Sequence, residues 1–195
     1  MWIRSQWPDA KEISRKVIHI GCGLLLPLSW SLGLPKILAL GASLCATLIV
    51  CLNHRMRWLA LIEDVERKTY GTILYCVSIC CLIIFFWDHC PGSMLAGALV
   101  MALSDGLASL VGRFVPSPKW LIYGQTKSLA GTSAMLLSTL GIIFVIQSGI
   151  GPQLSAMQIV AISLTITGLE QFSAYGFDNL SVPVTAASMI NIISL

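Results

Sequence analysis

The stretch LVMALSDGLASLVGR, residues 99–113, places a carboxylate, Asp105, inside an otherwise apolar segment. A carboxylate within a membrane-spanning helix costs at least ~2.5 kcal/mol on insertion scales, and such residues usually mark functional sites. Small residues share its face of the helical wheel at spacings of four and three: Ala98, Ala102, Ser109 and Gly112. Small side chains let a neighbouring helix approach closely. Asp105 is therefore predicted to point into a helix bundle and to bind a metal ion or polarise a substrate hydroxyl. The alternative is a structural ion pair or interhelical hydrogen bond.

The opposite face of the same segment is large and apolar. It carries Val100, Leu103, Leu107, Leu110 and Phe114. This face is predicted to contact lipid.

A second group of polar residues lies in EISRKVIHIGCG, residues 12–23, where Glu12, Lys16 and His19 recur on one helical face. A capping pattern at Asp9 and Glu12 predicts that this helix begins near residue 10. Arg15 and Lys16 are predicted phosphate ligands, and His19 is a candidate catalytic base. Alternatively, Arg15 and Lys16 anchor the helix to anionic headgroups.

The segment KSLAGTSAM, residues 127–135, opens another apolar run. A helix N-terminus offers unpaired N–H groups and a positive dipole end, which together form an anion site. Residues at this end are predicted to bind phosphates: Lys127, Ser128, Gly131 and Thr132. Lys127 is also a predicted catalytic residue, although it could simply end the loop. The spacing excludes a Walker A loop. Further basic residues near the membrane are predicted to assist: Arg67, Lys68 and Arg113.

The last polar group is EQFSAYGFDNLSVP, residues 170–183. Glu170 and Asp178, with Asp105, supply the hard oxygen ligands that Mg²⁺ favours beside substrate phosphates. Asn179 is predicted to contact the nucleotide. The alternative for Asp178 or Asn179 is a helix N-cap.

Together these groups supply the residue types that phosphoryl transfer requires: carboxylates for a metal ion, basic residues for phosphates and a candidate base. In this reaction positioning and charge neutralisation do most of the catalysis. A site at the membrane boundary requires a lipid-soluble acceptor. A lipid alcohol is the natural one, with a nucleoside triphosphate as donor and Mg²⁺ as cofactor.

The elements that must position these residues are membrane helices. Of the 195 residues, 56% are hydrophobic and 11% are charged, and a bilayer-spanning helix needs about 20 mainly apolar residues. Seven apolar runs meet that description: 18–34, 36–52, 70–87, 93–114, 128–147, 155–170 and 180–195. We expect an all-α polytopic membrane protein with about seven transmembrane helices in a single domain, 1–195. Its seven cysteines are expected to act as small apolar residues, since zinc-site spacing is absent.

The basic residues predict the orientation of the chain. Lys and Arg before, between and after the seven runs number 4, 1, 4, 0, 3, 0, 0 and 0. This alternation predicts a cytoplasmic N-terminus under the positive-inside rule, so the net charge of +3 reports topology and gives no sign of nucleic-acid binding. The polar groups named above then gather at the cytoplasmic face, while Lys36, Asp88 and His89 lie outside.

At these motifs the sequence resembles the polyprenol kinase superfamily, which includes phytol kinases, dolichol kinases and CTP-dependent diacylglycerol kinases. Four segments carry the resemblance in order: EISRKVIHIGCG, ERKTYG (66–71), SDGLASLVGR (104–113) with KSLAGTSAM, and EQFSAYGFDNLSVP. The segments KSLAGT and GFDNLSVP look most like those of the phytol kinase branch. The resemblance implies phosphorylation of phytol to phytyl phosphate with CTP as donor, in lipid metabolism that feeds tocopherol and chlorophyll synthesis. It implies an integral protein of a bacterial inner, thylakoid or plastid membrane, with its site on the cytoplasmic or stromal side.

Two departures from the family pattern stand out. Ser104 replaces a frequent Gly before the Asp, which keeps the carboxylate. Ala130 stands where the dolichol and diacylglycerol branches tend to have Glu, which argues against the dolichol branch or shifts metal binding towards Glu170 and Asp178.

Other functions stay open at this point. The residues alone do not distinguish phytol from dolichol, farnesol, geranylgeraniol or diacylglycerol as the acceptor. The segment DGLAS is similar to the start of the CDP-alcohol phosphotransferase motif, but Ser109 replaces its Arg and no D-x3-D follows. Such an enzyme, a cytidylyltransferase or a lipid transporter is the alternative, the transporter being disfavoured by the lack of midplane charges and inverted repeats. The sequence leaves the oligomeric state open.

Overall fold

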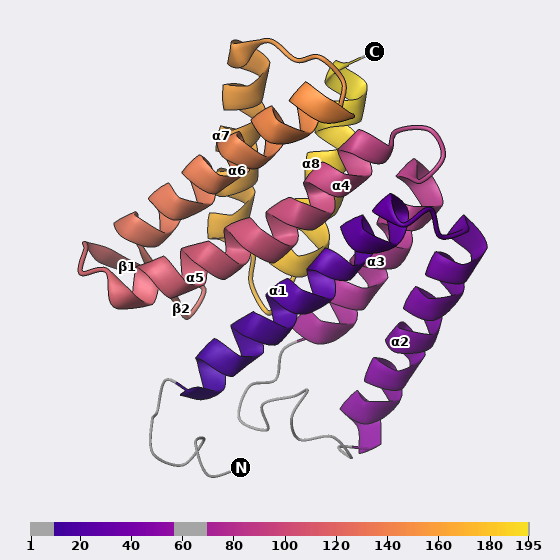
Figure 1. The fold of residues 1–195 in the computed structure, drawn as a ribbon. Helices are drawn as coiled ribbons and strands as arrows, with labels where there is room; N and C mark the ends of the chain where they lie inside the picture. Colours follow the sequence, from indigo (N-terminus) through magenta and orange to yellow (C-terminus); the bar gives the residue numbers. More distant parts are fainter. Residues whose placement is uncertain (1–9, 57–69, 195) are drawn as a thin grey trace.

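The computed structural model describes residues 10–56 and 70–194 (Figure 1). The helices before the hairpin are α1 (Ala10–Ser31), α2 (Lys36–Met56), α3 (Gly71–Phe86), α4 (Pro91–Leu99), the π-helix η2 (Val100–Ser104) and α5 (Asp105–Phe114). A β-hairpin follows, made of β1 (Lys119–Ile122) and β2 (Gln125–Ser128). The remaining helices are α6 (Leu129–Gly149), α7 (Ala156–Phe172) and α8 (Asp178–Ile193).

Each of the seven predicted apolar runs coincides with a helix, or with the continuous stretch α4–η2–α5. Three are long and apolar enough to cross a membrane, namely Lys36–Met56, Pro91–Phe114 and Leu129–Gly149. Two shorter helices, Gly71–Phe86 and Ala156–Phe172, are also apolar. The fold is therefore that of a helical membrane protein, while seven crossings and a cytoplasmic N-terminus remain predictions.

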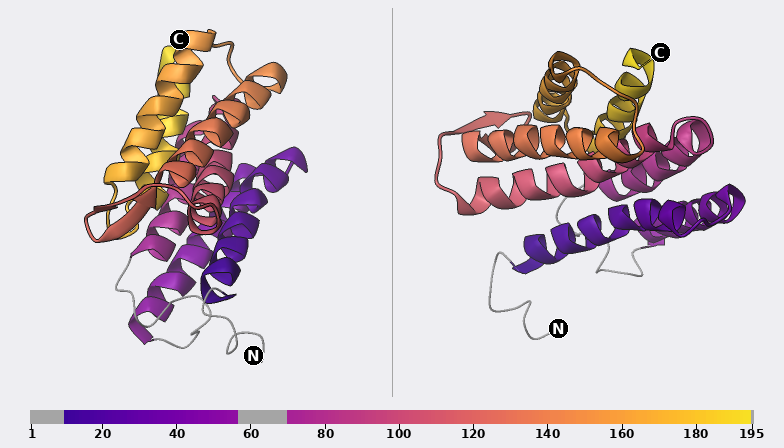
Figure 2. Two further views of the ribbon diagram at one scale, coloured as in Figure 1. Left: turned by 90° about the vertical axis from the view of Figure 1, so that its left-hand side faces the viewer. Right: turned by 45° about the horizontal axis from the view of Figure 1, so that its top comes forward.

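The stretch α4–η2–α5 lies at the centre of the bundle. It packs against α1 on one side and α6 on the other, and α4 also contacts α3 and α8 (Figure 2, right). The predicted stripe of small residues makes these approaches possible. A Cβ on Gly131 of α6 would lie 2.7 Å from the Ala108 carbonyl oxygen, and one on Gly23 of α1 would overlap Ala102.

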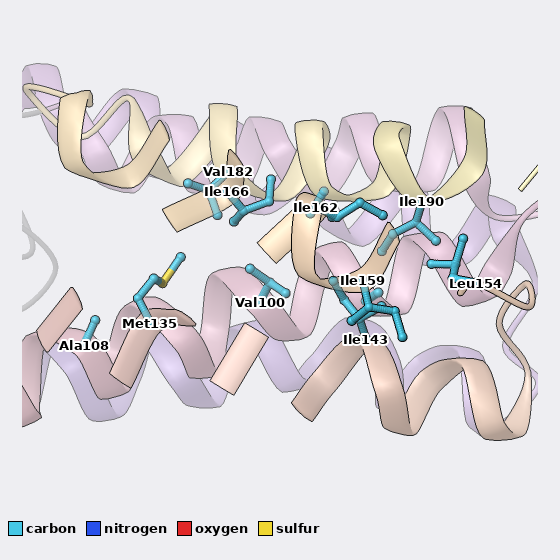
Figure 3. Packing of buried hydrophobic residues seen from close by; sticks show 12 residues of the cluster. Val100, Ala108, Met135, Ile143, Leu154, Ile159, Ile162, Ile166, Val182 and Ile190 are labelled. Atoms are coloured by element: carbon cyan, nitrogen blue, oxygen red, sulfur yellow. The ribbon is translucent and has the colours of Figure 1, made fainter. Parts of the chain in front are cut away.

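The main core lies between this central stretch and α6, α7 and α8. Val100, Met135, Ile143 and Ile166 are almost fully enclosed there (Figure 3). Lipid is as apolar as these side chains, so close van der Waals packing rather than the hydrophobic effect holds such helices together. The result is a rigid frame behind the polar residues of α5 and α6.

The π-helix interrupts the central stretch immediately before Asp105. The Asp105 N–H bonds to the carbonyl oxygen of Val100, five residues back, instead of that of Met101. The helical wheel used above assumes an uninterrupted α-helix, and its prediction that Val100 faces lipid is wrong, because this residue is fully buried in the core. Leu107 and Phe114, after the π-helix, are exposed as predicted.

The β-hairpin is a second element that the sequence did not predict. Lys119 pairs with Ser128 and Ile122 pairs with Gln125, which leaves a two-residue turn at Tyr123–Gly124. Both turn residues have positive φ, 48° and 76°, the backbone that matches the twist of a tight hairpin. The hairpin leads the chain from the end of α5 directly into α6.

Candidate functional site

A cavity of about 1160 Å³ opens between α1, α2, α3, α5, the hairpin and the α7–α8 connection. Every predicted site residue that the structure describes lines it: Arg15, Lys16, His19, Asp105, Arg113, Lys127, Ser128, Gly131, Thr132, Glu170, Asp178 and Asn179. Arg67 and Lys68 lie outside the described residues. The fold thus brings together residues from four separate segments, whose individual roles stay predictions.

Asp105 lines this cavity and is nearly buried. Lys16 Nζ donates to its Oδ2 at 2.8 Å, and His19 Nε2 lies 3.4 Å from the same oxygen. An ion pair is thus present, as the structural alternative required. The pair lines the cavity, however, and both contacts fall on Oδ2. Among the described residues, neither of these two contacts involves Oδ1.

His19 is fixed by three contacts. Its Nε2 lies 3.0 Å from the Met101 carbonyl oxygen, its own carbonyl accepts the Tyr75 hydroxyl at 2.7 Å, and the His19 and Tyr75 rings are 4.5 Å apart. A carbonyl oxygen accepts hydrogen bonds, so Nε2 must carry the hydrogen in this arrangement. A neutral His19 therefore has its lone pair on Nδ1, and Nε2 serves to hold the ring beside Asp105.

The π-helix explains why the Met101 carbonyl oxygen is available to His19. In an α-helix this oxygen would accept the Asp105 N–H. Here the Asp105 N–H goes to Val100 instead. Such single-turn π-segments occur frequently at functional sites.

A second cluster forms around Lys127, the next-to-last residue of β2. Its Nζ donates to a carboxylate oxygen of Glu170 and lies 3.2 Å from the Glu170 carbonyl oxygen. Gln171 donates to the other carboxylate oxygen at 2.7 Å and to the Thr132 hydroxyl at 3.0 Å. Sequence reasoning missed Gln171, because a lone glutamine carries no recognisable spacing signal. Its contacts show that it holds Glu170 and Thr132 in place.

The N-terminus of α6 differs from the predicted anion site. Its first three N–H groups are already bonded, Leu129 to the Pro118 carbonyl, Ala130 to the Ser117 hydroxyl at 3.1 Å and Gly131 to the Ser128 hydroxyl at 3.2 Å. The prediction of unpaired N–H groups is therefore wrong, because the hairpin and the Ser128 N-cap satisfy them. The helix dipole and Lys127 remain as the positive features of this end.

Asp178 and Asn179 enter the cavity from the start of α8. A tight connection precedes them, with positive φ at Tyr175 and Gly176, and Gly176 packs so closely on Gly71 that a Cβ would overlap it. Asp178 is the first residue of α8 and not its N-cap, and its Oδ1 accepts the Asn179 N–H at 3.0 Å. The N-cap alternative does not hold for Asp178.

Asp178 also links the two clusters electrostatically. Its carboxylate interacts with the charges of Asp105, Lys16 and Lys127. Within residues 10–56 and 70–194, no group of three His, Cys, Asp or Glu side chains is close enough to hold a metal ion unaided. Mg²⁺ is usually bound by one or two carboxylates with substrate phosphates and water. Asp105 and Asp178 fit that pattern, whereas both oxygens of Glu170 are engaged by neighbours.

The cavity has two chemically different ends. One holds the charged residues described above, and the other is an apolar groove between α1, α2 and α3. A separate ion pair, Lys36–Asp88 at 2.6 Å, joins the loop ends at the far side of the groove. The arrangement can bring a charged phosphate donor and an apolar acceptor to one carboxylate.

The sequence was compared with known proteins. A phytol kinase of Synechocystis sp. is 36% identical over 179 residues, which cover 90% of this chain and 77% of the relative. The chain belongs to the polyprenol kinase family, near its phytol kinase branch. Two plant relatives have a lower sequence identity to this chain. The probable phytol kinase 1, chloroplastic, of Glycine max is 30% identical over 137 residues, and the phytol kinase 1, chloroplastic, of Arabidopsis thaliana is 29% identical over 139 residues. The chain spans 45% of each of these two proteins.

No family model matches the chain, and no solved structure matches it. The cavity shows how the motifs that carry the family resemblance lie relative to one another. In this polyprenol kinase family member, the described motifs all line one cavity; they come from α1, α5, the hairpin with α6, and the α7–α8 connection.

Proposed function

We propose that the protein is a lipid-alcohol kinase that transfers the γ-phosphoryl group of CTP to phytol and yields phytyl phosphate. One observation carries the proposal: a single cavity joins a cationic end to an apolar groove, and Asp105 lies at their junction. The phytol kinase of Synechocystis sp. supports the choice of acceptor. The cyanobacterial and chloroplastic relatives support a thylakoid or plastid membrane as the location.

In this proposal the alcohol oxygen attacks the γ-phosphorus. The bond from the γ-phosphorus to its bridging oxygen breaks, and CDP leaves with that electron pair. The hydroxyl proton passes to Asp105 Oδ1. Lys16 donates to the other oxygen of this carboxylate and the His19 ring lies against it, so the carboxylate keeps a fixed orientation. Positioning and charge neutralisation then supply most of the rate enhancement.

The donor phosphates occupy the cationic end of the cavity. Lys127, Arg113 and Lys119 line it from the hairpin side, and Arg15 lines it from α1. Glu170 anchors Lys127 at the edge of the site, and Gln171 in turn anchors Glu170. Asn179 lines the same end from α8 and would contact the nucleotide.

Mg²⁺ fits the pair Asp105 and Asp178: Asp178 would bind it directly and Asp105 through one of its waters, which leaves Asp105 Oδ1 available for the hydroxyl proton. Bound there, it would neutralise charge that develops on the transferred phosphoryl group. The contribution of the chain is to hold two carboxylates from α5 and α8 on one wall, beside the lysines that set the local charge balance.

A labelling experiment tests this function. Membranes containing the protein are incubated with phytol and CTP labelled either in the γ- or in the α-phosphate. The proposal expects label in the lipid from γ-labelled CTP alone. Lipid label from α-labelled CTP would instead show cytidylyl transfer, and no lipid label with any nucleoside triphosphate would overturn the kinase function. ATP, GTP and UTP in the same assay test the preference for CTP.

A further inference from the structure

The apolar end of the cavity is a groove formed by three helices. Its walls are Leu25 of α1, Leu38, Ala42 and Ala46 of α2, and Ile79 and Ile83 of α3. We propose that this groove binds the hydrocarbon chain of the acceptor and that its depth measures the chain length the enzyme accepts. The inference rests on the proposed function, since it takes the acceptor to be a lipid alcohol.

The groove exists because α2 stands away from α1. α2 packs along α3 and makes few contacts with α1, although a short connection joins the two (Figure 1). Leu25 and Leu38 line the groove and are each 60% exposed. The groove therefore opens sideways onto an apolar surface, from which a membrane-dissolved chain can enter.

The polar atoms in the groove do not make it hydrophilic. The Ser29 hydroxyl donates to the Leu26 carbonyl at 2.8 Å, and the Ser43 hydroxyl donates to the Leu40 carbonyl at 2.9 Å. Serine side chains bonded to their own helix present mainly their carbon atoms to a neighbour. The lining is thus suited to an alkyl or isoprenoid chain and not to a polar ligand.

The groove is continuous with the site of phosphoryl transfer. Along α1, Lys16 contacts Asp105 at one end and Ser29 lines the groove at the other. At a helical rise of 1.5 Å per residue these positions are about 20 Å apart. Because α2 runs back along this direction, Ala46 lies nearer the charged end and Leu38 lies at the far end. A chain whose hydroxyl meets Asp105 must pass Ala46 before it reaches Leu38.

Two blocking variants at different depths test the inference. Ala46→Phe is expected to lower kcat/KM at least tenfold for phytol and geraniol while prenol, a short isoprenoid alcohol, is unaffected. Leu38→Trp is expected to lower it at least tenfold for phytol alone. Leu48→Phe is the matched control, because Leu48 is on the same helix, is 60% exposed and does not line the cavity.

The outcomes separate this inference from the proposed function. If kcat/KM for all three alcohols is unchanged in both blocking variants, or falls equally for all three, the groove does not determine the accepted chain length. If the wild-type protein phosphorylates none of them, the proposed function fails. The groove is then tested by binding alone, with a long-chain alcohol carrying a diazirine at its tail.

This probe is expected to label α2 and α3 around Leu38 and Ile83, and excess phytol is expected to prevent the labelling. Ala46→Phe should reduce the labelling at least fivefold, and Leu48→Phe should not change it. Labelling confined to the outer faces of α6 and α7, or labelling that phytol does not displace, would overturn the proposal.

Discussion

The His19 imidazole donates its Nε2 hydrogen to the Met101 carbonyl oxygen, 3.0 Å away, across the contact between α1 and the π-helix. This bond fixes the ring next to Asp105. It also assigns the hydrogen to the nitrogen that faces the carboxylate, 3.4 Å from Oδ2. The geometry therefore favours His19 as a positioning residue and Asp105 as the proton acceptor.

His19→Gln is expected to keep kcat within about tenfold of the wild type, because the glutamine amide can still donate to Met101. His19→Ala leaves that buried carbonyl without a donor, which costs about 1–3 kcal/mol, and we expect a further tenfold loss at least. The measurement is kcat/KM for phytol across about pH 5.5–8.5, the range in which a histidine base titrates. A His19→Gln enzyme slowed at least ~1000-fold, whose residual activity no longer falls at acidic pH, would instead identify His19 as the base.

Asp105→Asn is expected to reduce phosphorylation at least ~1000-fold, since an amide cannot accept the hydroxyl proton. The protein should still fold, because the amide oxygen can accept the Lys16 hydrogen bond. The matched control is Asp88→Asn, which breaks the Lys36 ion pair at the other end of the molecule and should not alter activity.

Removing one member of a nearly buried ion pair can by itself destabilise a protein by ~3–5 kcal/mol. The double variant Asp105→Asn/Lys16→Met removes both charges, so no unpaired charge is left to destabilise the fold. It should be recovered from membranes in wild-type amounts and remain inactive. Activity in a well-folded Asp105→Asn protein would remove Asp105 from the mechanism.

Mg²⁺ dependence distinguishes Asp178 from Glu170 as a metal ligand. Asp178→Asn is expected to raise the Mg²⁺ concentration for half-maximal activity about tenfold, because it removes one of two carboxylates that fit the ion. Glu170→Gln is expected to leave this concentration unchanged and to raise the KM for CTP, since Glu170 holds Lys127. The opposite pattern would place the metal at Glu170. Both are read from initial rates over a Mg²⁺ titration at saturating phytol.

Gly131→Ala is expected to destabilise the protein by ~1–3 kcal/mol, the usual effect of overpacking a close contact. Its Cβ would lie 2.7 Å from the Ala108 carbonyl oxygen, so α6 would have to move away from α5. Gly141 of the same helix has no atom within 4 Å of an added Cβ, and Gly141→Ala should be neutral or slightly stabilising. Thermal unfolding in detergent compares the two. Equal unfolding temperatures would show that α5 and α6 are not held at this distance.

The helices and the residues lining the site could be predicted from the sequence because both leave strong local signals. Long apolar runs identify membrane helices, and ionisable residues beside them are rare enough to stand out. Asp105 and Lys127 were found in this way, and both line one cavity. The Ser128 hydroxyl caps α6 and lines the same cavity, and its contact with phosphate stays a prediction.

Other features depend on tertiary structure and gave no signal. The π-helix rests on one shifted hydrogen bond, so a wheel drawn for an α-helix misplaced Val100. Gln171 matters because it joins its neighbour Glu170 to Thr132, which is distant in the sequence and lies on another helix. The groove arises from the separation of α1 and α2, which their apolar composition does not encode.

The π-helix holds one more residue between Val100 and Asp105 than an α-helix would. The Asp105 N–H already bonds to the Val100 carbonyl oxygen, so deleting one residue between Met101 and Asp105 would turn this bond into the ordinary four-residue bond of an α-helix. Asp105 would keep its place beside Lys16. The Met101 carbonyl oxygen would instead accept the Gly106 N–H, and His19 would lose its partner. A single in-frame codon loss would thus leave a protein that keeps its central carboxylate and yet no longer fixes the imidazole beside it.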